Sequence, residues 1–266
     1  MTRRWWHDAA LVAALVLAAA IAIPALMSAA WTPYAETALG TPLADAGAEH
    51  WLGTDRTGRD VLSALLVGTR ATVLTSLFAG LIALLIGVPA GVLASLGGWP
   101  QARTWHSVAG FAAPALLMAV MLTALGSPGL VTVILSVALP GAVVLTQATR
   151  RELDQLRQRD FVSAARLAGL SAVSAAQRHV VPKLLPRLIG LGLRLLAAAV
   201  VLEMTLSYGG LGFASQTISL GVMLQEAQGL LQLKPLPALA PGLVGLVLAL
   251  ALNVAASRLM GARRDS

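Results

Sequence analysis

The sequence of 266 residues is 57% hydrophobic and has a mean hydropathy of +0.78, which is more apolar than a soluble domain of this size. Only 12% of the residues are charged, yet the net charge is +7. In so apolar a chain, a basic excess indicates loops that face the cytoplasm rather than a surface for nucleic acid. Cysteine is absent, which excludes disulfides, thiolate metal sites and cysteine nucleophiles. The composition therefore predicts an integral membrane protein.

Six apolar segments are each long enough to cross a bilayer as a helix. The first runs from Ala9 to about Ala30 after a basic start with Arg3 and Arg4, a pattern that also fits a cleavable signal peptide. The other five cover residues 71–96, 107–125, 130–148, 188–206 and 236–259. The sequence thus predicts an all-α membrane protein with about six transmembrane helices.

These segments divide the chain into three parts. Residues 1–30 form an N-terminal region with the first helix, residues 31–70 an outer loop, and residues 71–266 a core domain with five transmembrane helices. Within the second apolar segment, Gly87 and Gly91 lie one turn apart and permit close contact with another helix.

A polar, basic loop over residues 150–187 interrupts the core domain. Most Lys and Arg residues fall in this loop, in residues 97–106 or near the two termini, so these segments are expected on the cytoplasmic side. The opposite segments hold few cations, namely Arg56, Arg59, Arg70 and Lys234. Both termini are therefore predicted to be cytoplasmic.

The basic loop contains its own signals for the start and end of helices. Asp160 can cap a short helix that Gly169 ends. Ser171 can cap a second helix, and Pro182 and Pro186 are expected to break the chain after it. A simple connection needs none of these signals. We interpret the loop as a docking element for a soluble partner, the alternative being a surface loop that binds lipid headgroups.

Motifs for catalysis or nucleotide binding are missing. The sequence has no GxxxxGK[ST] segment for a P-loop, no HExxH and no GxSxG. Its histidines are scattered over different segments at positions His7, His50, His106 and His179, so a metal site is not expected. We expect a chain that is not an enzyme and binds no cofactor itself.

Two charged residues lie within the fifth apolar segment. A lone charge at membrane depth costs a few kcal/mol, so Arg194 and Glu203 should each face protein or water. They are nine residues apart, about 14 Å along a helix, too far to pair with each other. Both are candidates for a translocation pathway or gate. The alternatives are that Arg194 extends to the interface and that Glu203 bonds to a neighbouring helix.

A glycine-rich segment follows Glu203. Gly209, Gly210 and Gly212 can stop the helix and let two backbones approach closely. Together with Ser207 and Tyr208, these glycines are further candidates for a gate. An ordinary flexible turn is the alternative interpretation.

Three motifs, in the same order, resemble those of one transporter family. Ser163-Ala164-Ala165, then Gly169 and Pro182, match the spacing of a cytoplasmic EAA-x3-G-x9-I-x-L-P motif, although Ser163 replaces the acidic residue. His50–Asp55 with Gly58–Ser63, and Glu203–Gly212, resemble two further segments of that family. On these grounds the chain resembles the inner-membrane permease subunits of binding-protein-dependent ATP-binding-cassette importers, in the dipeptide/oligopeptide/nickel branch.

The resemblance implies the type I importer permease fold, in which a cytoplasmic coupling helix sits in a groove of an ATPase subunit. The implied coupling residues are Asp160, Ser163, Ala164, Ala165, Ala168, Gly169 and Pro182. The alanines would keep this helix slim, and Gly169 would fix its angle to the next helix.

The resemblance also implies the partners. These are a second permease subunit in a heterodimer, two ATP-binding-cassette ATPase subunits that bind ATP and Mg, an external solute-binding protein, and the lipid of the bacterial inner membrane. The implied cargo is short peptides, with nickel or another metal chelate as the alternative. Two rivals are a secondary transporter, which predicts internal repeats that the sequence lacks, and a membrane scaffold without a transport role.

Overall fold

A computed structural model describes residues 9–35, 38–96, 129–157, 181–213, 217–230 and 232–261, with short pieces between 116 and 125. These residues form helices and connecting loops, apart from one isolated bridge between Thr54 and Asp60. The helices are α1 (Ala9–Met27), α2 (Val61–Leu96), α4 (Leu130–Arg157), α7 (Val181–Tyr208), α8 (Leu220–Glu226), η3 (Gln228–Leu230) and α9 (Pro235–Gly261).

Five of these helices, namely α1, α2, α4, α7 and α9, are long and apolar enough to cross a membrane. They coincide with five of the six predicted spans and confirm the all-α membrane architecture. The remaining span, predicted over 107–125, falls largely outside the described residues, and its described pieces are helical.

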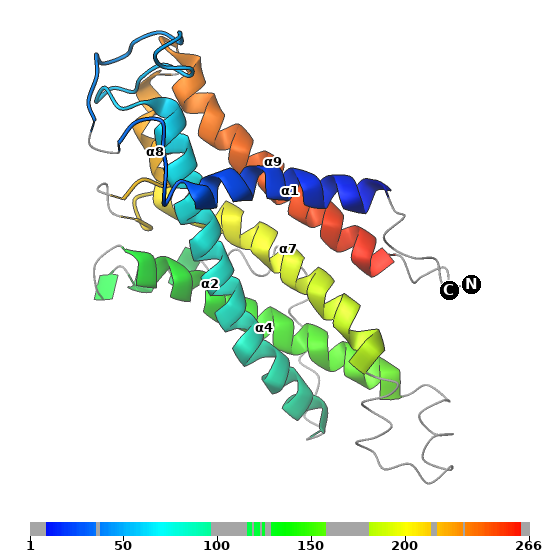
Figure 1. Ribbon diagram of the computed structural model, residues 1–266. Coiled ribbons are helices and arrows are strands. Elements are labelled where there is room, and N and C mark those ends of the chain that lie inside the picture. Colours follow the sequence, from blue (N-terminus) through cyan, green and yellow to red (C-terminus); the bar gives the residue numbers. More distant parts are fainter. Residues whose placement is uncertain are drawn as a thin grey trace.

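The long helices pack side by side around α7 (Figure 1). α7 lies between α2 and α9, α4 packs against α2, and α1 lies on α9. We call the end where α7 finishes and α2 and α9 begin the α8 end, because α8 packs there. The opposite end, where α4 finishes and α7 begins, is the α4–α7 end.

Close packing of α2 on α4 depends on the two glycines of α2. A Cβ atom at Gly87 would lie 2.6 Å from the carbonyl oxygen of Ala142, and one at Gly91 would lie 2.6 Å from that of Thr146. Real Cβ atoms do not approach an oxygen so closely. The predicted contact through this glycine pair is therefore confirmed, and Leu145 is buried beside it.

Helix α2 begins ten residues before the predicted start of its span. Asp60 causes this early start, because its Oδ2 atom accepts hydrogen bonds from both the backbone N–H and the hydroxyl of Ser63, each at 2.8 Å. This is the pattern of a helix N-cap. The other carboxyl oxygen of Asp60 lies 2.9 Å from Nδ1 of His50, so the same side chain also holds the preceding loop. The loop predicted over 31–70 thus ends at Asp60.

The basic loop is also shorter than the sequence predicts. α4 continues to Arg157, and α7 begins at Val181 rather than at residue 188. Pro182 and Pro186 were expected to break the chain, and that expectation is wrong, since both lie within α7. Proline is tolerated in the first turn of a helix, where the missing N–H has no partner to lose. For Pro186, the helix loses a single backbone bond.

Candidate functional site: a buried carboxyl cluster

Glu203 is fully buried near the end of α7, among hydroxyl groups from three helices. Its Oε2 accepts a 2.7 Å hydrogen bond from the hydroxyl of Thr72 on α2, and its Oε1 accepts a 2.8 Å bond from that of Ser207 on α7. The hydroxyl of Ser219, the residue that caps α8, also bonds to this carboxyl group. Thr72, Glu203, Ser207 and Ser219 are each 0% exposed, and we call them the Glu203 cluster.

The cluster positions the loop between α7 and α8. The backbone N–H of Phe213 donates to Ser207 Oγ, and that of Leu220 donates to Thr72 Oγ1, each at 3.3 Å. Each hydroxyl thus donates to Glu203 and accepts from a loop amide. Each carboxyl oxygen of Glu203 accepts one hydroxyl proton, which leaves the lone pairs of that hydroxyl free for a backbone N–H. Glu203 therefore orients two hydroxyls, one of which binds the backbone at Phe213 after α7 and the other the backbone at Leu220, where α8 begins.

Glycines bring the backbones of these elements together. A Cβ at Gly212 would lie 2.3 Å from Ser207 Oγ, and one at Gly221 would lie 2.5 Å from the carbonyl oxygen of Met204. Gly210 has a φ of +74°, a left-handed conformation that favours glycine. The segment from 209 to 213 is thus a closely packed turn whose shape requires glycine.

The predicted gate residues fall into two groups. Ser207 and Gly212 are buried beside Glu203, whereas Tyr208, Gly209 and Gly210 are exposed at the α8 end. Glu203 does bond to a neighbouring helix, as one of the two interpretations of this residue expects, because Thr72 lies on α2. A direct contact of any of these residues with a transported solute stays a prediction.

Arg194 is not part of the cluster. It lies half-buried on α7, about 14 Å along the helix from Glu203. The two charges therefore do not pair, as the sequence predicts from their separation.

The predicted coupling helix lies outside the described residues. This applies to Asp160, Ser163, Ala164, Ala165, Ala168 and Gly169; Pro182 lies in the first turn of α7, and its side chain is likewise not described. What the structure does describe is the pair of helix ends that flank this segment.

Polar contacts join three helices at the α4–α7 end, and sequence reasoning missed them. Arg187 on α7 forms an ion pair with Glu152 on α4. The hydroxyl of Ser95 on α2 donates a 2.7 Å bond to Asp154 on α4. The available signal was the presence of Glu152 and Asp154 just after the apolar segment 130–148. Their partners, however, lie far away in the sequence.

The motif of residues 50–55 and 58–63 forms a turn in the outer loop. Asp55 Oδ1 accepts hydrogen bonds from the N–H and hydroxyl of Thr57 and from the N–H of Arg59, at 2.7–2.9 Å. Gly53 and Gly58 have φ values of +76° and +83°, and a Cβ at either would lie within 2.5 Å of a carbonyl oxygen. This motif therefore builds a fixed turn that leads into Asp60 and α2.

Comparison with known proteins agrees with the fold and the motifs. Residues 87–262, about two thirds of the chain, match the family model described as binding-protein-dependent transport system inner membrane component. The nickel transport system permease protein NikC of Escherichia coli is 31% identical, over 91% of this chain and 88% of NikC.

Two further relatives carry other names. The dipeptide transport system permease protein DppC of Alkalihalophilus pseudofirmus is 29% identical, over 88% of this chain and 77% of its own length. The glutathione transport system permease protein GsiD of Pectobacterium atrosepticum is 28% identical, over 77% of this chain and 69% of its own length. The chain therefore belongs to the family of inner membrane components of binding-protein-dependent transport systems.

Proposed function

We propose that this chain provides half of the translocation pathway of an ATP-driven importer for short peptides. The observation that carries the proposal is the family match over residues 87–262. Relatives named as dipeptide, glutathione and peptide permeases favour a peptide cargo. The other half of the pathway would be a second, similar permease subunit.

Nickel or another metal chelate is the second candidate cargo, because NikC is 31% identical over most of both chains. Among the residues that the structure describes, no three His, Cys, Asp or Glu side chains are grouped to hold a metal ion. In this alternative the metal would cross as a chelate whose ligands come from a carrier molecule.

Coupling to ATP hydrolysis would occur at the segment between α4 and α7. Two ATPase subunits bind ATP and Mg in this proposal, and the helix predicted over 160–169 docks in a groove on one of them. The Glu152–Arg187 ion pair and the Ser95–Asp154 bond join α4 to α7 and to α2. A force applied between α4 and α7 would therefore move these helices together.

The Glu203 cluster would pass that movement to the opposite end. Phe213, which follows α7, is bonded to Ser207 of α7, and Leu220, the first residue of α8, is bonded to Thr72 of α2. A tilt of α7 against α2 would strain the Glu203–Thr72 bond and shift Leu220 relative to residues 207–213. With both termini in the cytoplasm, as the distribution of Lys and Arg predicts, the α8 end faces outward and residues 207–212 act as the outer gate.

Transport by the purified complex tests the proposal. The complete complex in proteoliposomes, supplied with its external solute-binding protein, should take up a labelled peptide when ATP is on the ATPase side. Uptake should continue after ionophores collapse the ion gradients, and excess peptide rather than a nickel chelate should compete. Uptake that follows an ion gradient without ATP would identify a secondary transporter. Competition by the chelate alone would assign the cargo to nickel.

A further inference from the structure

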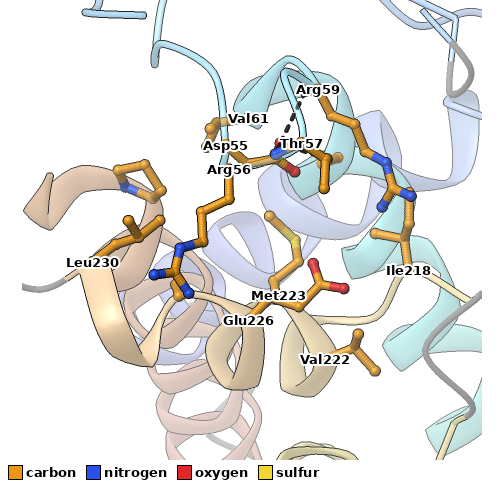
Figure 2. A pocket seen from close by; sticks show the side chains of 13 residues that line it. Asp55, Arg56, Thr57, Arg59, Val61, Ile218, Val222, Met223, Glu226 and Leu230 are labelled. Atoms are coloured by element: carbon orange, nitrogen blue, oxygen red, sulfur yellow. Dashed lines mark hydrogen bonds between the residues drawn. The ribbon is translucent and has the colours of Figure 1, made fainter. Parts of the chain in front are cut away.

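A cavity of about 270 Å³ opens at the α8 end, on the side of α8 that faces away from Glu203. Its floor is apolar and includes Val61 of α2, Val222 and Met223 of α8, and Leu230 of η3. Its rim carries the charged side chains of the turn that precedes α2 and of the end of α8. Figure 2 shows the apolar and charged side chains that line the cavity.

The charges on the rim are unevenly matched. Figure 2 shows the Glu226 carboxylate pointing into the cavity, between the guanidinium groups of Arg56 and Arg59. Partial burial raises the pKa of Glu226; Arg59 opposes this shift and Asp55 adds to it. Asp55 Oδ1 already accepts three hydrogen bonds from the turn of the outer loop. Arg59 thus faces Glu226, and no acidic side chain among the described residues forms an ion pair with Arg56.

The exposed Arg56 side chain places its guanidinium against Gly229, which leaves space for it because it has no side chain. A Cβ atom at Gly229 would lie 3.3–3.4 Å from the two terminal nitrogens of the Arg56 guanidinium. The guanidinium therefore lies directly over Gly229 at the edge of the cavity, where an incoming carboxylate can reach it. Arginine binds carboxylates with two parallel hydrogen bonds, a strong and geometrically specific contact.

The size of the cavity selects the kind of occupant. Pockets that enclose a small molecule usually have volumes of about 300–1,000 Å³, and this cavity lies below that range. An apolar hollow with an arginine at its edge is instead typical of the anchoring pockets of protein–protein interfaces. A single apolar side chain would fill the floor, and a neighbouring acidic residue would reach Arg56.

We propose that this cavity docks a loop of the external solute-binding protein, which places an apolar side chain on the floor and a carboxylate at Arg56. The inference rests on the proposed function, because it requires an external partner and an outward-facing α8 end. α8 separates the cavity from the Glu203 cluster: Met223 lines the cavity, while Gly221 packs against Met204 and Ser207. A docked loop therefore presses on the helix that Ser219 and Thr72 hold in place.

The test uses the complete complex in lipid nanodiscs and the solute-binding protein that stimulates its ATPase activity. The Kd between the two is measured for four single variants. Arg56→Glu should weaken docking by about tenfold or more. Arg56→Lys should weaken it by less, because lysine keeps the positive charge but cannot form two parallel hydrogen bonds to a carboxylate. Gly229→Leu should also weaken docking, since its side chain displaces the guanidinium. Lys234→Gln is the matched control: Lys234 pairs with Asp45 and does not line the cavity.

The outcomes separate this inference from the proposed function. Docking that stays within about twofold of wild type in both Arg56→Glu and Gly229→Leu would overturn the docking site, while ATP-driven uptake by the wild type would keep the importer. A wild-type complex without ATP-driven uptake would overturn both. A labelled peptide that binds the wild type but not Arg56→Glu, with no binding protein present, would assign the cavity to the cargo and also overturn the docking site.

Discussion

The carboxyl group of Glu203 on α7 and the hydroxyl of Thr72 on α2 are joined by a 2.7 Å hydrogen bond, although 131 residues separate them. Both side chains are completely buried. Thr72 also accepts the backbone N–H of Leu220, so the pair connects two membrane-spanning helices to the start of α8. An ionisable side chain within a span is costly to bury, and here three hydroxyl groups bond to its carboxyl group.

Replacing Glu203 with Gln should loosen the loop between α7 and α8. The amide offers one acceptor oxygen, so one of the two hydroxyls loses its acceptor and a buried donor is left unsatisfied, at a cost of about 1–3 kcal/mol. We expect hydrogen exchange over residues 213–220 to become faster and transport to fall, while the complex still assembles. Exchange measured by mass spectrometry on the complex checks this.

Glu226→Gln is the matched control for the exchange measurement, made without the solute-binding protein, because it makes the same change on the exposed side of α8. Exchange rates over 213–220 that are equal in the two variants would show that Glu203 does not position the loop. A Glu203→Gln complex that falls apart in detergent would instead make the residue necessary for assembly.

Gly87→Val should destabilise the contact between α2 and α4. The added side chain meets the Ala142 carbonyl oxygen and Leu145, and overpacking of this kind costs about 1–3 kcal/mol. For a chain of this size, the melting temperature in detergent should fall by about 2–12 °C. Gly129→Val is the control, since no atom of the described residues lies within 4 Å of a Cβ there. An equal shift in both variants would contradict the packing role of Gly87.

The Glu152–Arg187 ion pair should matter more for coupling than for stability. Both side chains are partly exposed, so the pair contributes about 1 kcal/mol or less to stability. Arg187→Glu should lower the amount of solute imported per ATP hydrolysed, because like charges then separate α4 from α7. The double variant Glu152→Arg with Arg187→Glu should restore the ratio. A double variant as defective as the single one would show that the ion pair is not the cause.

Glu226 should make docking of the solute-binding protein depend on pH. The pKa of Glu226 lies above the ordinary glutamate value of 4.5. As the pH falls, Glu226 therefore becomes protonated before an ordinary glutamate does. Protonation releases Arg59, which can then join Arg56 in binding the partner's carboxylate, with Asp55 still held by its turn. Docking should therefore tighten as the pH falls through this window and weaken as it rises.

Glu226→Gln should tighten docking at pH 7 by about two- to fivefold, the effect of removing one partly exposed competing charge. It should also remove the part of the pH dependence that comes from Glu226. The Kd of the nanodisc complex measured from pH 7 down to pH 5 gives both results. Weaker docking in Glu226→Gln would show that this carboxylate attracts the partner instead of competing for Arg59.

The spans and the family-like motifs could be predicted from the sequence because both depend on local patterns. Hydrophobic length identified α1 and α9, and the spacing of Gly87 and Gly91 identified a close contact. The start of α2 was missed because Asp60 caps the helix within a polar stretch that reads as loop. The end of the basic loop was missed because Pro182 and Pro186 lie where a helix tolerates them.

The partners of the buried charge could not be predicted in the same way. The sequence shows Glu203 in an apolar segment, but Thr72 comes from a helix 131 residues away. Threonine is common in such helices and gives no signal of its own. The same holds for Glu152 and Arg187, whose pairing depends on how α4 and α7 lie relative to each other.

The ratio of solute imported to ATP hydrolysed, measured in proteoliposomes for Gly169→Val, tests most directly whether an ATPase drives transport through this chain. Gly129→Val serves as the control, because in the part of the chain that the structure describes nothing lies within 4 Å of a Cβ at that glycine. We predict that Gly169→Val inserts and assembles, still hydrolyses ATP and imports little solute, while the control behaves as wild type. Normal uptake by Gly169→Val would contradict the account.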